Sequence, residues 1–424
     1  MRLNFIHYLG FILAFFTNQR FTLEPINTYV CLIPLLMFFI WNKKHDFQFI
    51  FLSLFTIADK GAGAFLDTPS IIKYVIYSIS LTYVFKNLKW EKYTLLIFQS
   101  LIVYYLNITI FNVGLIKLQY FSYDMITLIV LLLMFLVLVN KVNVDHICID
   151  EKLLLYSSIG LMSSDVINML FLYEYGSSYY LSFSPIRIFI YFPSLYFLVR
   201  GDKYKSGILF LIAFYLSIGY QTRMNFIVGT LCYFWLYFRM HPKSTTIILA
   251  SLLLFFSVNL SVFSGYRIFD LLFLLNNYSN IVSLLESLDP VRFNEYRLYF
   301  SSELFNILFG HGLGIGIHDK SSILPLSILD SSAFSKEEIS TSIYYKLHDA
   351  LLYISKSYGL IAFVLLLSIL LHFVRSQTYF HLTTRYTMLM LFLLASYSIT
   401  SNIILLLLTI TVQKASLGYR KYEN

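Results

Sequence analysis

A small set of arginine and histidine residues carries the chemistry that this sequence offers. Arg292 and Arg297 lie in LDPVRFNEYRLYFSSELFNILFG, His348 lies in KLHDALLYISKSYG, and Arg223 lies in GYQTRMNF. An arginine stays charged and either reaches lipid headgroups with its long stem or binds an anion in a cavity. A histidine has an ordinary pKa near about 6.5 and accepts a proton at neutral pH. Each residue also has a plainer interpretation, which is a solvated arginine or a structural histidine.

The two arginines of the first motif are expected on one helix. Asp289 can cap its N-terminus, Pro290 suits the first helical position, and Gly310 ends it. Residues five apart are separated by about 140° around a helix, so Arg292 and Arg297 cannot share a face. We expect Arg297 to face a site and Arg292 to face water or lipid headgroups.

The glycine-rich segment GHGLGIG follows this helix, with glycine at 310, 312, 314 and 316. Its spacing differs from that of a dinucleotide-binding loop. Alternating glycines indicate a backbone that turns tightly and packs close to a neighbour, either a helix or a phosphate. The segment also carries His311.

One group of histidines and aspartates invites a metal interpretation. Metal ligands usually stand at short, fixed offsets on one element, and the gaps between these histidines are 7 and 30 residues. We therefore predict no metal site and no cofactor. The group comprises His311, His318, His348, Asp319 and Asp349.

An aspartate and two cysteines lie inside apolar runs. Asp165 lies within the run 153–173, where a carboxylate either has a function or hydrogen-bonds to a neighbouring helix. Cys31 and Cys232 also lie in apolar runs, and with Cys148 they form an odd set without metal-site spacing, so no structural disulfide or zinc site is expected.

The composition identifies the environment of these residues as a membrane. The chain has 424 residues, of which 58% are hydrophobic and only 13% are charged. Soluble domains carry about 25% charged residues, so a soluble globular enzyme is excluded. At about 20 apolar residues a span, the chain can supply about a dozen spans.

Apolar runs separated by charged breaks predict an all-α, polytopic integral membrane protein with about 12–14 transmembrane helices. If the N-terminus is cytoplasmic, the short inner loops carry more than twice as many Lys and Arg residues as the short outer loops, as expected. Residues 1–263 then form the first part of a helical bundle and residues 351–424 form its C-terminal helices. Residues 264–350 form one large, partly helical loop on the outer, periplasmic face.

This arrangement resembles a known family. The arginine in a short outer loop, the late outer loop with ILFGHGLGIG, and HDALLYISKSYGLIAFVLLL are similar to the Wzy-type oligosaccharide repeat unit (O-antigen) polymerases and the related O-antigen ligases. The strongest element is His348 followed by an apolar stretch and Tyr358-Gly359-Leu360. Family members usually have Asn after this histidine, whereas this chain has Asp349.

The resemblance implies a glycosyltransferase of the bacterial inner membrane that builds surface polysaccharide such as lipopolysaccharide O-antigen or capsule. Its donor is an oligosaccharide on undecaprenyl pyrophosphate. Arg223, Arg297 and Arg292 would bind the pyrophosphate, and His348 would be the catalytic base for inverting transfer. His311, Asp349 and Asp165 are supporting candidates.

Other partners expected from the resemblance are membrane lipid and the chain-length regulator and flippase of the same pathway, without nucleic acid. An O-antigen ligase, which transfers the glycan to the lipid A core, is the alternative closest in chemistry. A flippase for the lipid-linked repeat is the alternative from another class, but it predicts repeated halves and charges lining the membrane interior.

Overall fold

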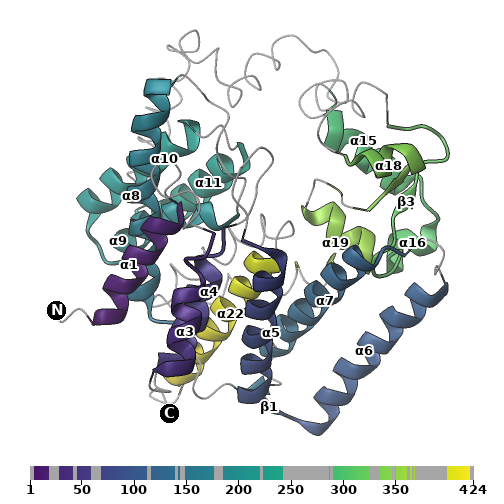
Figure 1. Cartoon of the computed structure of the whole chain (residues 1–424), viewed down its shortest axis with the longest axis horizontal. Helices are drawn as coiled ribbons and strands as arrows, with labels where there is room; N and C mark the ends of the chain where they lie inside the picture. The colour runs from purple at the N-terminus through teal and green to yellow at the C-terminus, as the bar shows by residue number, and fades with distance from the viewer. Residues whose placement is uncertain are drawn as a thin grey trace.

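The computed structural model describes residues 4–18, 28–41, 45–58, 68–111, 116–138, 142–143, 149–175, 185–219, 223–241, 286, 290–324, 334–345, 347, 350–360, 363–364, 367 and 399–420. These residues are predominantly helical, as predicted (Figure 1). Helices suit a membrane because they satisfy the polar groups of the backbone within one segment.

The helices follow in chain order, with one 3₁₀ helix, η3. The first group is α1 (Phe5–Asn18), α3 (Leu32–Ile40), α4 (Asp46–Phe55), α5 (Ser70–Asn87), α6 (Lys92–Phe111), α7 (Leu118–Leu138) and α8 (Glu151–Tyr175). The second group is η3 (Pro185–Tyr191), α9 (Phe192–Val199), α10 (Lys203–Gly219), α11 (Arg223–Met240), α15 (Pro290–Phe300), α16 (Leu304–Phe309), α18 (Lys336–Thr341), α19 (Ala350–Tyr358) and α22 (Ile399–Arg420).

Two short strand pairs add to the helices. Strand β1 (Lys89–Trp90) pairs antiparallel with β2 (Val142–Asn143). Strand β3 (Ile317–His318) pairs antiparallel with β4 (Ile343–Tyr344), with Ile317 opposite Tyr344. The second pair joins two parts of the predicted outer loop.

Three helices among the described residues are long and apolar enough to cross a membrane: α6, α7 and α8. Several shorter apolar helices accompany them. Helix α4, which corresponds to the predicted run 47–58, has 10 residues and a length of about 15 Å, half the thickness of a bilayer core. The protein is therefore membrane-embedded and helical, and not every apolar run is a full-length span.

The main core lies where α1, α4, α8, η3, α9 and α22 meet. Helices α1 and α8 pack against each other in parallel. At their first turns His7 Nε2 lies 2.7 Å from Asp150 Oδ2, and near the end of α1 the Asn18 amide donates to Asp165 Oδ1 at 2.5 Å. The middle of α22 lies near the start of α8, where Ile149 N, two residues before α8, donates to the Thr411 hydroxyl.

The described part of segment 264–350 packs as a separate unit beside the ends of α6 and α7. In Figure 1 its helices α15, α16 and α18 lie together with β3, and α19 lies between them and α7. The unit has its own apolar cluster, which includes Leu298, Tyr299, Tyr344, Leu347 and Leu352. This unit carries Arg292, Arg297 and His311 of the predicted site.

One sequence-based expectation needs correction here. The helix predicted from Pro290 to Gly310 is two helices, because Glu303 takes an extended conformation (ψ 143°) and starts α16 anew. The Ser301 hydroxyl donates to the Leu298 carbonyl at this break, and serine commonly competes with helical hydrogen bonds in this way. Helix α22 begins at Ile399, and Thr400, Ser401 and Asn402 in its first turn are buried.

Candidate functional site

Helix α15 presents one buried face and one open face. Asn294, Glu295, Leu298 and Tyr299 are buried, and the Tyr299 hydroxyl donates to the Ile307 carbonyl at 2.9 Å. This contact ties α15 to α16, and both helices pack on α19. The buried glutamate was not predicted, since nothing in the local sequence distinguishes its face.

The two arginines of α15 lie on different faces, as the helical geometry requires. Arg297 is exposed, and its Nη1 donates to Asn294 Oδ1 at 3.3 Å. Arg292 is half-buried. Arg297 therefore offers its guanidinium to the open surface of the unit, and Arg292 is the more enclosed of the two.

The glycine-rich segment lies against helices, which settles its open interpretation. Gly310 has φ +91°, and a Cβ there would be 2.5 Å from the Ser357 carbonyl oxygen of α19. Gly314 has φ +71°, and its Cβ would be 2.6 Å from the backbone nitrogen of Phe121 in α7. Only glycine fits either position, because the conformation is left-handed and the neighbour is backbone.

His311 is locked inside this contact. Its Nδ1 lies 3.3 Å from the Lys356 carbonyl and its Nε2 lies 3.2 Å from the Ser302 hydroxyl. Nδ1 therefore donates to the carbonyl, and Nε2 accepts from the hydroxyl. Burial lowers the pKa of His311 to about 4, and the nearby Lys356 ammonium acts in the same direction. The imidazole is neutral at pH 7 and holds the segment on α19.

Asp124 and Lys356 complete the contact. Neither residue was predicted from the sequence to belong to a site. Asp124 is fully buried on α7, where Oδ2 accepts from the backbone N–H of Gly314 at 2.7 Å and Oδ1 accepts from the Tyr353 hydroxyl. Lys356 is fully buried on α19, where Nζ donates to the carbonyls of Ile315 and Tyr345 at 3.0 and 2.7 Å. Both residues are charged and stand in or beside an apolar run, and this feature of the sequence could have identified them.

These interactions define a clamp, by which we mean Asp124, Lys356 and the segment 310–316 between them. Opposite charges on two helices hold successive residues of one loop, and they also attract each other. Two more hydroxyl groups strengthen the contact, since Tyr358 donates to the Asp124 carbonyl and Tyr105 donates to the Tyr358 carbonyl. The segment 310–316, and with it the described part of 264–350, is thereby fixed to α6, α7 and α19.

A second buried polar cluster lies in the bundle, away from the clamp elements. Arg187 is only 3% exposed, and its Nη2 donates to Asn18 Oδ1 at 3.2 Å and lies 3.7 Å from Asp165 Oδ1. The Asn168 amide donates to the Asn18 carbonyl. Asp165 thus hydrogen-bonds to a neighbouring helix, which was one of its two interpretations. The burial of Arg187 in η3 was not predicted from the sequence.

The structure describes only some of the remaining predicted residues. Arg223 is the first residue of α11, and its side chain lies outside the described residues. His348 and Asp349 also lie outside the described residues. His318 is exposed on β3, and Asp319 accepts from the backbone N–H groups of Ile323 and Leu324. No group of three potential metal ligands occurs among the described residues.

The unit thus brings Arg292, Arg297 and His311 together on one body. The chemistry it offers is an exposed guanidinium, which suits an anionic ligand, on a helix docked firmly to membrane-embedded elements. The sequence matches no model of a known protein family and no curated protein, and no solved structure matches the fold.

Proposed function

We propose that the protein polymerises oligosaccharide repeat units carried on undecaprenyl pyrophosphate, at the periplasmic face of the bacterial inner membrane. The observation that carries the proposal is the exposed guanidinium of Arg297 on a helix of the outer unit. The sequence arrangement around Arg223 and His348, which resembles the Wzy-type polymerases, supports the same function.

In the proposed reaction a hydroxyl oxygen of the acceptor sugar attacks the anomeric carbon of the donor glycan. The bond from that carbon to the phosphate oxygen breaks, and undecaprenyl pyrophosphate leaves with the bonding electron pair. His348 takes the hydroxyl proton, and Arg297 and Arg223 bind the departing pyrophosphate. Fixed positive charge at the leaving group stabilises the transition state more than the bound substrate. Pyrophosphate is a good leaving group and needs no strong acid.

The test replaces Arg297 in a strain whose own copy is deleted. Arg297→Ala should lower polysaccharide formation by about 100-fold, because the guanidinium is exposed and its removal leaves the helix packing intact. Arg297→Lys keeps the charge but loses the planar fork, so an intermediate activity is expected. The measurement is the surface polysaccharide ladder on a gel, with the amount of protein in the membrane checked by immunoblot.

Lys320→Ala is the matched control, since Lys320 is an exposed cation of the same outer unit but lies off α15. It should leave the ladder unchanged. A full ladder in the Arg297→Ala strain would refute the role of this residue.

The deletion strain itself separates polymerase from ligase and from flippase. A polymerase deletion leaves lipid A capped with single repeat units. Uncapped core with long chains on the carrier lipid would indicate a ligase, and repeat units retained on the cytoplasmic side would indicate a flippase.

A further inference from the structure

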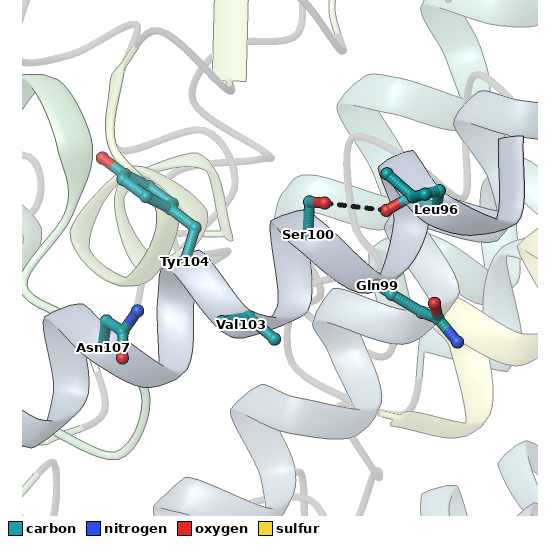
Figure 2. A pocket seen from close by; sticks show the side chains of 6 residues that line it. All are labelled: Leu96, Gln99, Ser100, Val103, Tyr104 and Asn107. Atoms are coloured by element: carbon teal, nitrogen blue, oxygen red, sulfur yellow. Dashed lines mark hydrogen bonds between the residues drawn. The ribbon is translucent and has the colours of Figure 1, made fainter. Parts of the chain in front are cut away.

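Helix α6 carries a polar stripe on the side away from the rest of the protein. A shallow depression along one face of this helix is formed by Leu96, Gln99, Ser100, Val103, Tyr104 and Asn107 (Figure 2). These residues are exposed, whereas Phe98, Tyr105 and Ile108 on the opposite face are buried. Helix α6 is also the most exposed of the three candidate spans, with 28% of its apolar window buried, against 44% in α7 and 61% in α8.

Both amides of the stripe lie inside the span. The window runs from Tyr93 to Ile110, so Gln99 and Asn107 lie about 9 and 21 Å along a window of about 27 Å. In the part of the chain that the structure describes, neither amide hydrogen-bonds to a protein group. An amide that faces hydrocarbon without a hydrogen bond is costly. A partner at this depth must be polar and protein-based, because sugar and phosphate headgroups lie at the interface.

We infer that the stripe is the interface between two copies of this chain. All copies insert with the same orientation, so the two-fold axis of a dimer runs along the membrane normal. Each residue near that axis then meets its own counterpart, and Gln99 faces Gln99 while Asn107 faces Asn107. An amide both donates and accepts, so two identical amides satisfy each other, as they do between membrane helices. Leu96 and Val103 supply the apolar contact between them.

The chemistry of the stripe favours this partner over a different membrane protein. Helix α6 has no charged residue after Lys92 that would select an oppositely charged helix. A different protein would need amides at two matching depths, whereas a second copy has them by symmetry. The inference does not depend on the proposed glycosyl transfer.

The test is cysteine cross-linking in native membranes at two neighbouring positions. Leu96 lies on the stripe and is 60% exposed, and Ile97 lies off it and is 53% exposed. Leu96→Cys should give a disulfide-linked dimer on mild oxidation, and Ile97→Cys should give little. The wild type, in which Cys31 and Cys232 are buried, gives the background.

A second set of variants tests the amides. Gln99→Leu with Asn107→Leu, added to Leu96→Cys, should lower the cross-linked fraction by about threefold or more. Ser100→Ala is the matched control and should leave it unchanged, because the Ser100 hydroxyl donates to the Leu96 carbonyl of its own helix at 2.8 Å (Figure 2).

Equal cross-linking at the two cysteine positions would overturn the inference, since it indicates random collision. So would an absence of the dimer, a product containing a different protein, or a cross-linked fraction that survives removal of both amides. Loss of polysaccharide synthesis in an arginine variant tests the proposed function and leaves this result untouched.

Discussion

His311 shows how burial decides the role of a residue type. Its imidazole accepts from Ser302 and donates to the Lys356 carbonyl, so both ring nitrogens are engaged. A pKa lowered to about 4 makes it a weak base at neutral pH. His311 therefore holds the glycine-rich segment on α19 and is a poor proton acceptor at neutral pH.

The lowered pKa of His311 predicts a pH dependence of stability. The unfolded chain binds a proton at this histidine below about pH 6.5, whereas the folded chain does so only below about pH 4. The unfolded state thus binds more protons in this window, and the free energy of unfolding falls as the pH falls through it. Between pH 7 and pH 5 the loss should be about 2 kcal/mol, measured by thermal unfolding in detergent.

His311→Gln should remove most of this loss, because an amide does not titrate. His318→Gln is the matched control and should keep the wild-type pH dependence, since His318 is exposed on β3. If His311→Gln and the wild type lose the same stability between pH 7 and pH 5, the lowered pKa is not the cause.

At the scale of elements, the clamp joins two helices and a loop that are far apart in sequence. Asp124 holds the Gly314 N–H from α7, and Lys356 holds the Ile315 carbonyl from α19. A buried charge whose counter-charge is removed is strongly destabilising. The contact therefore contributes to stability only while both residues are present.

This coupling can be measured with a double-mutant cycle. Asp124→Asn and Lys356→Met should each lower the free energy of unfolding by about 3 kcal/mol or more. The double variant should lose less than the sum, because neither charge is then left alone. Denaturation in detergent, followed by tryptophan fluorescence or helical circular dichroism, gives the values.

The Lys117–Glu337 ion pair is the matched control. It also joins the outer unit to the start of α7, but its side chains are 27% and 60% exposed. Solvent screens such a pair, so removing both groups should cost at most about 1 kcal/mol, with little coupling. Additive effects for Asp124 and Lys356 would contradict the clamp.

The elements themselves were largely predictable. The apolar runs within the described residues became helices, and Pro290 and Gly310 mark the start of α15 and the end of α16 as predicted. The break at Ser301–Glu303 was missed, because helix propensity is a weak signal beside tertiary contacts. The burial of Arg187 was missed because its partners, Asn18 and Asp165, come from other helices.

For the whole molecule, the orientation in the membrane stays a prediction that labelling can test. Lys320 is exposed in the outer unit, and Tyr204, at the start of α10, is 88% exposed. With the N-terminus cytoplasmic, Lys320→Cys should react with a membrane-impermeant maleimide in intact spheroplasts. Tyr204→Cys should react only after permeabilisation.

The wild type controls for native cysteines, of which Cys31 and Cys232 are buried. The reverse pattern, with Tyr204→Cys labelled from outside, would invert the predicted orientation. Labelling of both positions in intact spheroplasts would mean that they lie on the same side of the membrane.

The sequence by itself determined the membrane environment and the helical class. Composition and the spacing of apolar residues decide these features, and both are local properties of the chain. It also marked the glycine-rich segment as a close contact. Only the tertiary structure decided that the neighbours are α7 and α19, that His311 is locked there, and that Asp124 and Lys356 hold the segment from two sides. These contacts join residues about 40 to 230 positions apart in the sequence. Burial and charge compensation between residues so far apart in the sequence depend on tertiary packing, which no local pattern encodes.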